Sequence, residues 1–348
     1  MKALVTGATG FTGSRLAGRL VDAGHEVRAL CRPGSTVDPL VEQGIQIVEG
    51  DITDPDAVAR AVKGVEKVYH IAACFRTAGH TDDYYRAVNR DGTEHVLEAA
   101  RLCGTERVIH CSTGGVHGHI EPEIAPADET TRFNPGDIYQ ITKLEGELLA
   151  QEAIKSGQPV TIFRPAGIYG PGDLRLLKLF QAIQKGWFVM FGRGDVNFGL
   201  VYIDDLVDGI LLCGERDEAL GETFILSGPE SLPLREMVRT IATILEVNFP
   251  KWRFPVRPLL MASALCEAVC VPLGIEPPLH PRRAHVFVKN RQFTHAKATR
   301  LLGYQPRVHA EDGLRRTATW YYAEGHLDGP MPEKLRQASS DSVARHST

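Results

Sequence analysis

The residues MKALVTGATGFTG at positions 1–13 decide the fold of this chain. The run KALVT alternates into a β-branched, strand-like end, and Gly7, Gly10 and Gly13 follow at once, before a helical pattern at 14–23. A strand, a glycine turn and a helix in this order form the context of a dinucleotide-binding fingerprint. The first glycine permits the tight turn, the second admits the pyrophosphate, and the third lets helix and strand pack closely. Phosphates then bind the unpaired amides at the positive end of the helix.

Strand-like apolar runs alternate with helical patterns through the first two-thirds of the chain. This alternation predicts an α/β fold with a parallel, doubly wound sheet of the Rossmann type and helices on both faces. About seven strands are expected, near 2–6, 26–31, 45–48, 66–72, 106–112, 159–164 and 223–227. The helices are expected near 11–23, 55–62, 83–103, 137–156, 174–186 and 204–214.

The pattern also predicts how the chain divides. Residues 1–172 are expected to form an NAD(P)-binding domain, which the chain rejoins at about 201–228. Residues 173–200 and 229–328 contain shorter elements and many prolines, so they predict a smaller α/β substrate-binding lobe over the carboxyl ends of the strands. The tail at 329–348 is polar and without periodicity, and we expect it to be mobile.

Composition excludes several classes of partner. The formal charge of −4 gives no basic field for a nucleic acid, so none is expected as a partner. The seven cysteines are odd in number and form no CxxC pair, which supports neither a disulfide framework nor a metal site. Because the chain enters a core strand directly, no targeting segment is expected and the cytoplasm is the predicted location.

One apolar stretch tests that prediction. The stretch at 259–275, LLMASALCEAVCVPLGI, is broken only by Glu267 and Pro272. It is shorter than the roughly 20 residues that cross a bilayer as a helix, so no integral membrane span is expected. We favour a buried amphipathic helix, and a lid over an apolar substrate or a loose membrane contact stays open.

A second motif predicts proton-transfer chemistry. Tyr139 and Lys143 (YQITK) stand four residues apart in a helical pattern, so both project from one face. A free tyrosine has a pKa of about 10, and a neighbouring ammonium favours its phenolate. The same ammonium can hold a ribose hydroxyl of a cofactor, while the tyrosine exchanges a proton with an alcohol or carbonyl oxygen. The strand-like run at 107–118 ends in hydroxyl residues, of which Thr113, with Ser112 next, is the candidate to bind that oxygen, unless both merely form a turn.

In this order the motifs resemble the extended short-chain dehydrogenase/reductase family over about residues 1–325. The resemblance rests on TGATGFTG (6–13), GDITD (50–54), HIAA (70–73), NRDGT (89–93), STGGVHG (112–118), YQITK (139–143) and RPAGIYGPGD (164–173). It implies that Thr113, Tyr139 and Lys143 are catalytic. One departure is His117, where many members carry tyrosine, and it is expected to reshape the substrate side.

The resemblance also implies a cofactor site. Asp51 and Ile52 would flank the adenine, Ala72 and Ala73 would line the path to the nicotinamide ribose, and Asn89 would brace the central strands. The segment after Arg164 would contact the nicotinamide carboxamide. The expected cofactor-binding residues are Gly7, Thr9, Gly10, Phe11, Thr12, Gly13, Arg32, Asp51, Ile52, Ala72, Ala73, Asn89, Tyr139, Lys143, Pro165 and Ile168.

The end of the second strand predicts which nicotinamide cofactor binds. An acidic residue there grips the ribose 2′-hydroxyl of NAD, whereas a nearby arginine suits the 2′-phosphate of NADP. Here Cys31 stands at the acidic position and Arg32 follows. A guanidinium matches phosphate geometry, so NADP(H) is favoured. If Arg32 only covers the adenine, NAD(H) remains usable.

The substrate is predicted from an absent charge pair and from apolar residues. Nucleotide-sugar enzymes of this family usually carry Arg-Asp where this chain has Phe198 and Gly199, and without that clamp tight diphosphate binding is not expected. Three arginines could replace the missing charge pair as diphosphate ligands, although each is expected to be a solvated surface charge; they are Arg193, Arg282 and Arg283. The aromatic residues suggest a hydrophobic cleft instead, unless they are core; they are Trp187, Phe188, Phe191 and Phe198.

The terminal run LLGYQPRVHAEDGLRRTATWY (301–321) resembles the 3β-hydroxysteroid dehydrogenase and dihydroflavonol reductase branches. We therefore predict an NAD(P)-dependent oxidoreductase that interconverts a ketone or aldehyde and an alcohol on a small, largely apolar molecule. The alternatives are a nucleotide-sugar epimerase or dehydratase with tightly bound NAD, and a non-enzymatic, cofactor-sensing regulator. Resemblance also favours a homodimer through the helices near 83–103 and 137–156.

Overall fold

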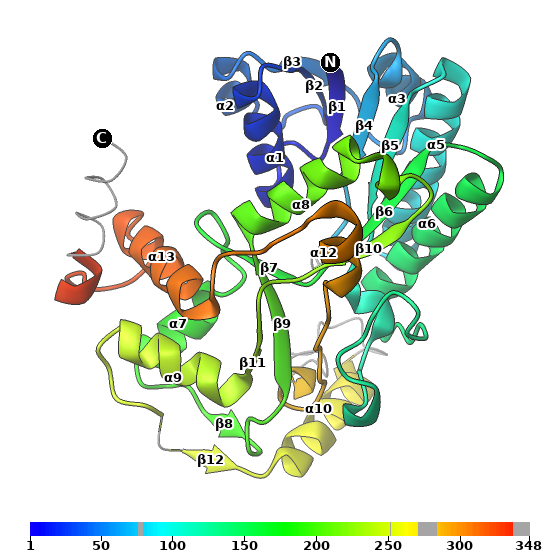
Figure 1. Cartoon of the computed structure of the whole chain (residues 1–348). Coiled ribbons are helices and arrows are strands. Elements are labelled where there is room, and N and C mark those ends of the chain that lie inside the picture. Colours follow the sequence, from blue (N-terminus) through cyan, green and yellow to red (C-terminus); the bar gives the residue numbers. More distant parts are fainter. Residues whose placement is uncertain (76–78, 251, 271–283, 337–348) are drawn as a thin grey trace.

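The computed structural model describes residues 1–75, 79–250, 252–270 and 284–336, and seven of its strands form one parallel sheet (Figure 1). Its order is β10-β6-β5-β4-β1-β2-β3. The strands are β1 (Lys2–Thr6), β2 (Glu26–Cys31), β3 (Gln46–Glu49), β4 (Lys67–His70), β5 (Arg107–Cys111), β6 (Val160–Pro165) and β10 (Thr223–Leu226). Every pairing between them is parallel, which confirms the predicted doubly wound sheet.

Helices cover both faces of this sheet (Figure 1). One face carries α1 (Phe11–Asp22) and α8 (Ile203–Glu215), and the other carries α3 (Pro55–Val62), α5 (Gly92–Cys103) and α6 (Ile138–Lys155). The buried central strands β1, β4, β5 and β6 require this arrangement, because a sheet with two apolar faces must be covered on both sides. Two short helices, α2 (Asp38–Glu42) and α4 (Asp82–Arg86), complete this part of the chain.

The order of the strands reverses at β1, which has β2 on one side and β4 on the other. In the register, Thr6 at the end of β1 lies beside Leu30 of β2 and His70 of β4. Open α/β sheets bind ligands in the crevice outside the carboxyl ends of the strands at such a switch point. The fold therefore fixes where a site is expected.

The glycine turn after β1 has the predicted form. Gly7 has a φ of +73°, and the amide of Gly10 donates to its carbonyl at 3.0 Å. A Cβ on Gly13 would lie 2.1 Å from the Gly7 carbonyl oxygen, so no side chain fits there. This contact brings α1 directly against the turn.

We expect Gly13→Ala to lower the free energy of unfolding by about 1–3 kcal/mol or more, because the added methyl group overlaps the backbone. The matched control is Gly18→Ala in the same helix, where the nearest atom to the new Cβ is the end of the Gln43 side chain. That control is expected to gain up to about 1 kcal/mol from helix propensity. Urea unfolding followed by circular dichroism measures both, and equal effects would contradict the packing role of Gly13.

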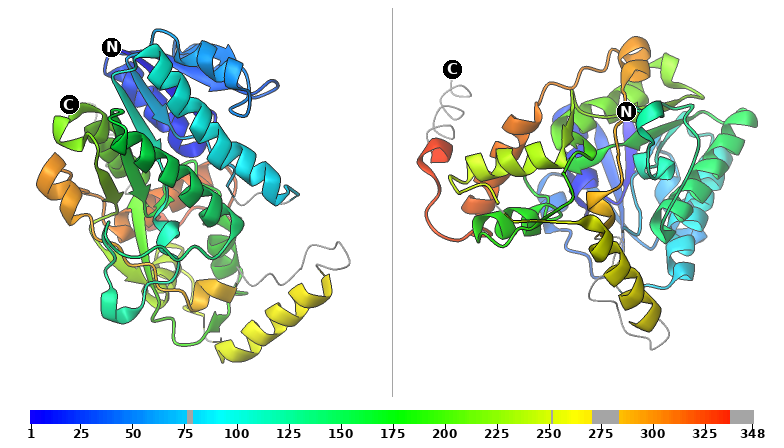
Figure 2. Two further views of the ribbon diagram at one scale, coloured as in Figure 1. Left: turned by 90° about the vertical axis from the view of Figure 1, so that its right-hand side faces the viewer. Right: turned by 90° about the horizontal axis from the view of Figure 1, so that it is seen from below.

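The remaining elements lie beside the main sheet (Figures 1 and 2). A three-stranded sheet has the order β11-β9-β7, and β12 pairs with β8. The strands are β7 (Gly167–Tyr169), β8 (Met190–Phe191), β9 (Asn197–Tyr202), β11 (Ser231–Pro233) and β12 (Arg253–Phe254). The helices are α7 (Leu177–Gln184), α9 (Leu234–Ile244), α10 (Val256–Cys270), α12 (Ala296–Leu302) and α13 (Ala310–Ala323). The predicted division into a cofactor domain and a substrate lobe stays an interpretation.

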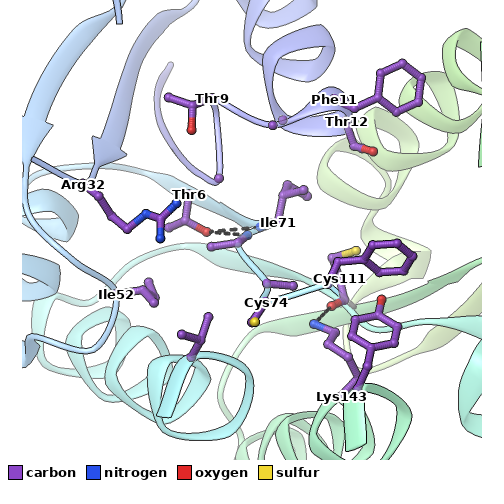
Figure 3. Close-up of a pocket in the computed structure, with 18 of the residues that line it drawn as sticks. Thr6, Thr9, Phe11, Thr12, Arg32, Ile52, Ile71, Cys74, Cys111 and Lys143 are labelled. Atoms are coloured by element: carbon purple, nitrogen blue, oxygen red, sulfur yellow. Dashed lines mark hydrogen bonds between the residues drawn. The ribbon is translucent and has the colours of Figure 1, made fainter. Parts of the chain in front are cut away.

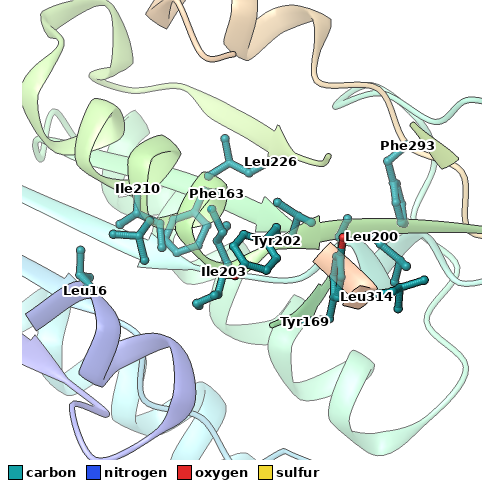
Figure 4. Packing of buried hydrophobic residues seen from close by; sticks show 14 of the residues in the cluster. Leu16, Phe163, Tyr169, Leu200, Tyr202, Ile203, Ile210, Leu226, Phe293 and Leu314 are labelled. Carbon is teal, nitrogen blue, oxygen red and sulfur yellow. The ribbon is translucent and has the colours of Figure 1, made fainter. Parts of the chain in front are cut away.

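One buried cluster runs through both groups of elements (Figure 4). It includes Leu16 of α1, Phe163 of β6, Ile210 of α8, Leu200 of β9 and Leu314 of α13, all at most 8% exposed. Residues that are far apart in the sequence thus share one core. The main sheet and the elements beside it therefore pack directly against one another through this core.

Two expectations need correction. The helix predicted at 83–103 is α4, then a π-helical turn over Ala87–Asp91, then α5. In the tail predicted to be mobile, Leu335 is buried and packs with the core, while 337–348 lie outside the described residues, so the mobility of the tail stays a prediction. The buried helix predicted at 259–275 is wrong for α10, in which only Ser263 is buried; its apolar side chains are half-buried or exposed. Residues 271–275 lie outside the described part.

Across the described stretches of chain, the structure contains no helix whose length and apolar character suffice to cross a membrane.

Candidate active site

A cavity of about 610 Å³ lies at the carboxyl ends of β1 and β4 (Figure 3). Its size is within the range of sites that enclose a small molecule or cofactor. Of the residues expected to bind the cofactor, all except Asn89 line this cavity. The lining residues among them are Gly7, Thr9, Gly10, Phe11, Thr12, Gly13, Arg32, Asp51, Ile52, Ala72, Ala73, Tyr139, Lys143, Pro165 and Ile168. Thr113 is also not among its lining residues, whereas Ser112 is.

The floor of the cavity is fixed by the hydroxyl of Thr6. Its Oγ1 accepts the amides of Ile71 at 3.1 Å and Ala72 at 3.2 Å (Figure 3), and it lies 2.8 Å from Nδ1 of His70. Burial lowers the pKa of His70 to about 3, so the imidazole is neutral. Its Nε2 lies 3.1 Å from Oγ1 of Thr93, which donates to a backbone carbonyl. This pattern assigns the proton to Nε2 and makes Thr6 the donor to Nδ1.

Asn89 supports the cavity from behind. Its side-chain amide donates to the carbonyl of Cys74 and to Oγ1 of Thr142, and its carbonyl accepts the amide of Cys74 at 2.8 Å. It therefore ties the segment after β4 to helix α6. The π-helical turn that interrupts the predicted long helix is the segment that contains Asn89. Such turns are frequent at functional sites.

Helix α6 contributes Tyr139 and Lys143 to the lining of the cavity. Figure 3 shows the side chain of Lys143 beside Cys111. The side chain of Asp137 caps the helix by accepting the amide of Gln140. Lys143 is 1% exposed, and its Nζ donates to the carbonyl of Cys111 at the end of β5. Burial lowers the pKa of this lysine. The hydrogen bond holds the Nζ of Lys143 at the end of β5, one helical turn from Tyr139.

The two candidate hydroxyls differ in what they bind. Ser112 lines the cavity, but its Oγ donates to the buried carboxylate of Glu147. Thr113 accepts the amide of Gly115 at 3.1 Å and caps a short 3-10 helix over Gly114–His117. The Ser112 proton is thus occupied within the protein. Among the described residues the Thr113 hydroxyl donates to no acceptor, which favours Thr113 as a donor to a ligand.

Sequence reasoning missed a buried ion pair behind these residues. Arg164, at the end of β6, donates through Nε and Nη2 to Glu147, and both side chains are at most 2% exposed. Arg164 Nη1 also lies 3.2 Å from Nε2 of His117. Burial and this guanidinium lower the pKa of His117, so the ring accepts from Arg164 in its neutral form. The one available signal was the position of Glu147, four residues after Lys143 and on the same face of α6.

We expect Glu147→Gln to lower the free energy of unfolding by about 3–5 kcal/mol, because it leaves the Arg164 charge buried and uncompensated. The control is Glu98→Gln, which removes an exposed carboxylate that pairs with Arg101, and which should leave stability unchanged within error. Chemical unfolding of both variants tests this. A loss below about 1 kcal/mol for Glu147→Gln would contradict the account of the buried pair.

At the opposite end of the cavity, Arg32 follows the buried Cys31. Its Nη1 lies 3.4 Å from the hydroxyl of Tyr84, whose ring stacks on His80 at 4.2 Å between centroids. The Asp51 carboxylate accepts from the backbone and hydroxyl of Thr53, so it is bound within its own loop. Among the described residues at this end, Arg32 is therefore the group suited to bind an anion.

A third cation lines the cavity and was not predicted. The guanidinium of Arg175 lies 5.4 Å from the ring centroid of Phe11 and 5.7 Å from that of Phe75. Its Nε donates to Asp173, which is also at the cavity wall. Phe11 is the first residue of α1, and Phe75 meets Tyr139 edge-to-face at 4.9 Å. Arg175 thus stands between the glycine turn and the tyrosine.

The aromatic residues expected to form a hydrophobic cleft do not line this cavity. Phe188 and Phe191 pack with Phe287, and Phe198 lies beneath the guanidinium of Arg291. Trp187 is 76% exposed. Among the arginines proposed to compensate for the missing charge pair, Arg193 is exposed and pairs with Asp195, while Arg282 and Arg283 lie outside the described residues.

The model of the NAD dependent epimerase/dehydratase family matches residues 3–226. The chain belongs to this family. It is 31% identical to a "3 beta-hydroxysteroid dehydrogenase/Delta 5-->4-isomerase" of Mycobacterium tuberculosis over 92% of this chain and 90% of that protein. It is also 31% identical to a "2-alkyl-3-oxoalkanoate reductase" of Stenotrophomonas maltophilia, covering 91% of this chain and 98% of the relative.

Among solved structures, the protein named gox2253 superposes with a TM-score of 0.81 at 30% identity, over 94% of this chain and 99% of that one. These matches confirm the predicted membership of the extended short-chain dehydrogenase/reductase family. They also confirm the prediction of an NAD(P)-dependent oxidoreductase, and with it a nicotinamide cofactor.

Proposed function

We propose that the cavity binds NADP(H) and that this enzyme interconverts an alcohol and a ketone or aldehyde on a small, largely apolar molecule. The observation that carries the proposal is the placement of Tyr139 and Lys143 in the same cavity as the glycine turn at Gly7 and Gly10. The cofactor supplies or accepts the hydride. The protein's own residues bind both reactants and move one proton.

Each catalytic residue has a proposed role. The phenol oxygen of Tyr139 exchanges the proton with the substrate oxygen, and the Lys143 ammonium, held by the Cys111 carbonyl, favours the phenolate. The remaining N–H groups of Lys143 can bind ribose hydroxyls. Thr113 donates to the substrate oxygen and keeps it beside Tyr139. These roles agree with the free proton of Thr113 and the burial of Lys143.

We expect Tyr139→Phe to lower turnover by about 100-fold or more, because the proton then has no positioned donor or acceptor. Nucleotide affinity should change little, since the ring and Lys143 remain. The control is Tyr322→Phe, which removes a hydroxyl bound by Gln184 away from the cavity and should keep near-normal turnover. Steady-state assays use NADPH and the best ketone from a screen. Near-normal turnover in Tyr139→Phe would overturn the mechanism.

The preference for NADP is proposed to come from Arg32. No carboxylate stands at the end of β2, where Cys31 is buried, and Arg32 lines the cavity at that end. A guanidinium forms bidentate, charge-assisted hydrogen bonds with a phosphate. Arg175 is proposed to act on the diphosphate, which NAD and NADP share, because it lies beside the first residue of α1.

We expect Arg32→Asp to weaken NADP binding by about tenfold or more, through loss of a charge-assisted contact, and to improve NAD binding. Arg175→Ala is the matched control, because it should weaken NADP and NAD to a similar degree. Dissociation constants from fluorescence titration of each variant give the comparison. If Arg32→Asp leaves the NADP-to-NAD ratio unchanged, the 2′-phosphate is recognised elsewhere.

The proposed substrate class is supported by the names of the relatives. The mycobacterial relative is named for a 3β-hydroxysteroid and the Stenotrophomonas relative for a 2-alkyl-3-oxoalkanoate. Both names describe an oxygen-bearing carbon on a largely apolar skeleton. A screen of secondary alcohols and ketones of this kind therefore comes first, with oxidation and reduction of nicotinamide as the signal.

A nucleotide-sugar epimerase or dehydratase is the second candidate, because the matching family includes both activities. Phe198 and Gly199 argue against it, since neither binds a diphosphate through a charged side chain. A homodimer through α5 and α6 is also proposed, supported by the exposed side chains of Leu102, Ile141 and Leu148. A cytoplasmic location stays a prediction from the sequence.

A further inference from the structure

The segment of residues 252–270, which contains β12 and α10, exposes large apolar side chains. Met261, Leu265 and Val269 are 74%, 67% and 54% exposed, and their spacing of four residues places them on one stripe of α10. Trp252 and Phe254, just before the helix, are 67% and 48% exposed. Figure 2 shows α10 at the edge of the molecule, away from the main sheet. Large apolar side chains exposed together on one short segment indicate an interaction site.

The composition of α10 differs from that of a helix on a water-facing surface. Of its 15 residues only Arg257 and Glu267 are charged, and only Ser263 is buried in the protein. A helix that is apolar on all sides is normally enclosed by a protein core or by lipid. At about 1.5 Å per residue, α10 is about 22 Å long, short of the roughly 30 Å of a bilayer's hydrocarbon core. A helix of this length can lie in one face of a bilayer without crossing it.

The charges around the segment favour one kind of partner. Between Glu246 and Glu267 the sequence contains three cations, Lys251, Arg253 and Arg257, and no acidic residue. Arg253 and Arg257 are exposed. Clusters of basic residues beside an apolar segment are attracted to anionic headgroups. Tryptophan is enriched at the boundary between headgroups and acyl chains, which suits Trp252 at the base of α10.

We propose that the 252–270 segment docks the enzyme on the surface of a bilayer that contains anionic phospholipid. The stripe of Met261, Leu265 and Val269 enters the acyl region, and Arg253 and Arg257 face the phosphates. A second copy of the chain is a poorer occupant, because a twofold contact presents the same patch from both subunits. A twofold contact at the base of α10 would bring Arg253 and Arg257 of both subunits together, and like charges across an interface oppose association. The proposal does not depend on which substrate the cavity takes.

The test is co-sedimentation of the full-length protein with large vesicles. Binding is expected with phosphatidylcholine that contains phosphatidylglycerol, and weaker binding with phosphatidylcholine alone or at high salt. The double substitution Met261→Glu with Leu265→Glu should lower the vesicle partition coefficient by about tenfold or more, because both apolar side chains leave the lipid. Arg253→Glu with Arg257→Glu should remove the preference for phosphatidylglycerol.

The control is Val41→Glu on α2, which changes another exposed apolar residue, 55% exposed, on a different helix and should bind as the parent does. Circular dichroism confirms that each variant is folded. No sedimentation of the parent protein would overturn the proposal, as would equal loss of binding in Val41→Glu. Light scattering tests the alternative occupant. The proposal would also be overturned if the parent were a dimer that does not bind vesicles and the Met261→Glu, Leu265→Glu variant were a monomer, since a second copy would then cover α10.

Discussion

The hydrogen bonds of Thr6 are the constraint on which the site depends. This hydroxyl joins the end of β1 to the end of β4, and through His70 and Thr93 the same network reaches Asn89 and helix α6. The glycine turn that precedes the first helix and the helix that carries the tyrosine are therefore fixed relative to one another by buried polar contacts. A fully satisfied network in a low-dielectric interior rigidifies the parts it connects. The distance between the glycine turn and the Tyr139 and Lys143 pair is set in this way.

Charge at the centre of the fold is concentrated in one lysine. Burial lowers the pKa values of His70 and His110, and the nearby ammonium of Lys143 lowers them further, so both imidazoles are neutral and Lys143 is the cation. One turn beyond, Glu147 is neutralised by Arg164. Tyr139, Lys143 and Glu147 thus form a stripe on α6 in which the first residue lines the cavity and the last anchors the helix to β6.

Local spacing predicted the parts of the site that are local in sequence. The glycine turn, the tyrosine and lysine four residues apart, and Arg32 after Cys31 all lie where short patterns indicated, and all reach one cavity. Arg175 and the pairing of Glu147 with Arg164 were missed. Their positions depend on contacts between segments that are distant in the sequence, and no short sequence pattern shows which of these segments meet.

Packing decided the remaining differences between sequence and structure. The apolar run at 259–275 predicted a buried helix, but burial depends on whether another element covers the helix, and in α10 only Ser263 is fully buried. The long helix expected at 83–103 is interrupted where Asn89 bonds across to Cys74 and Thr142. Sequence periodicity alone shows neither whether another element packs on a helix nor which distant residues of the chain form a hydrogen bond.

The central claim is that this enzyme exchanges a nicotinamide cofactor during turnover. The most direct test is to release and identify any nucleotide that the purified wild-type protein carries, and then to titrate the empty protein with NADP and NAD. We expect little retained nucleotide, removal by simple dialysis, and tighter binding of NADP. One equivalent of NAD per chain that resists removal would contradict the account and would direct the search to nucleotide-sugar substrates.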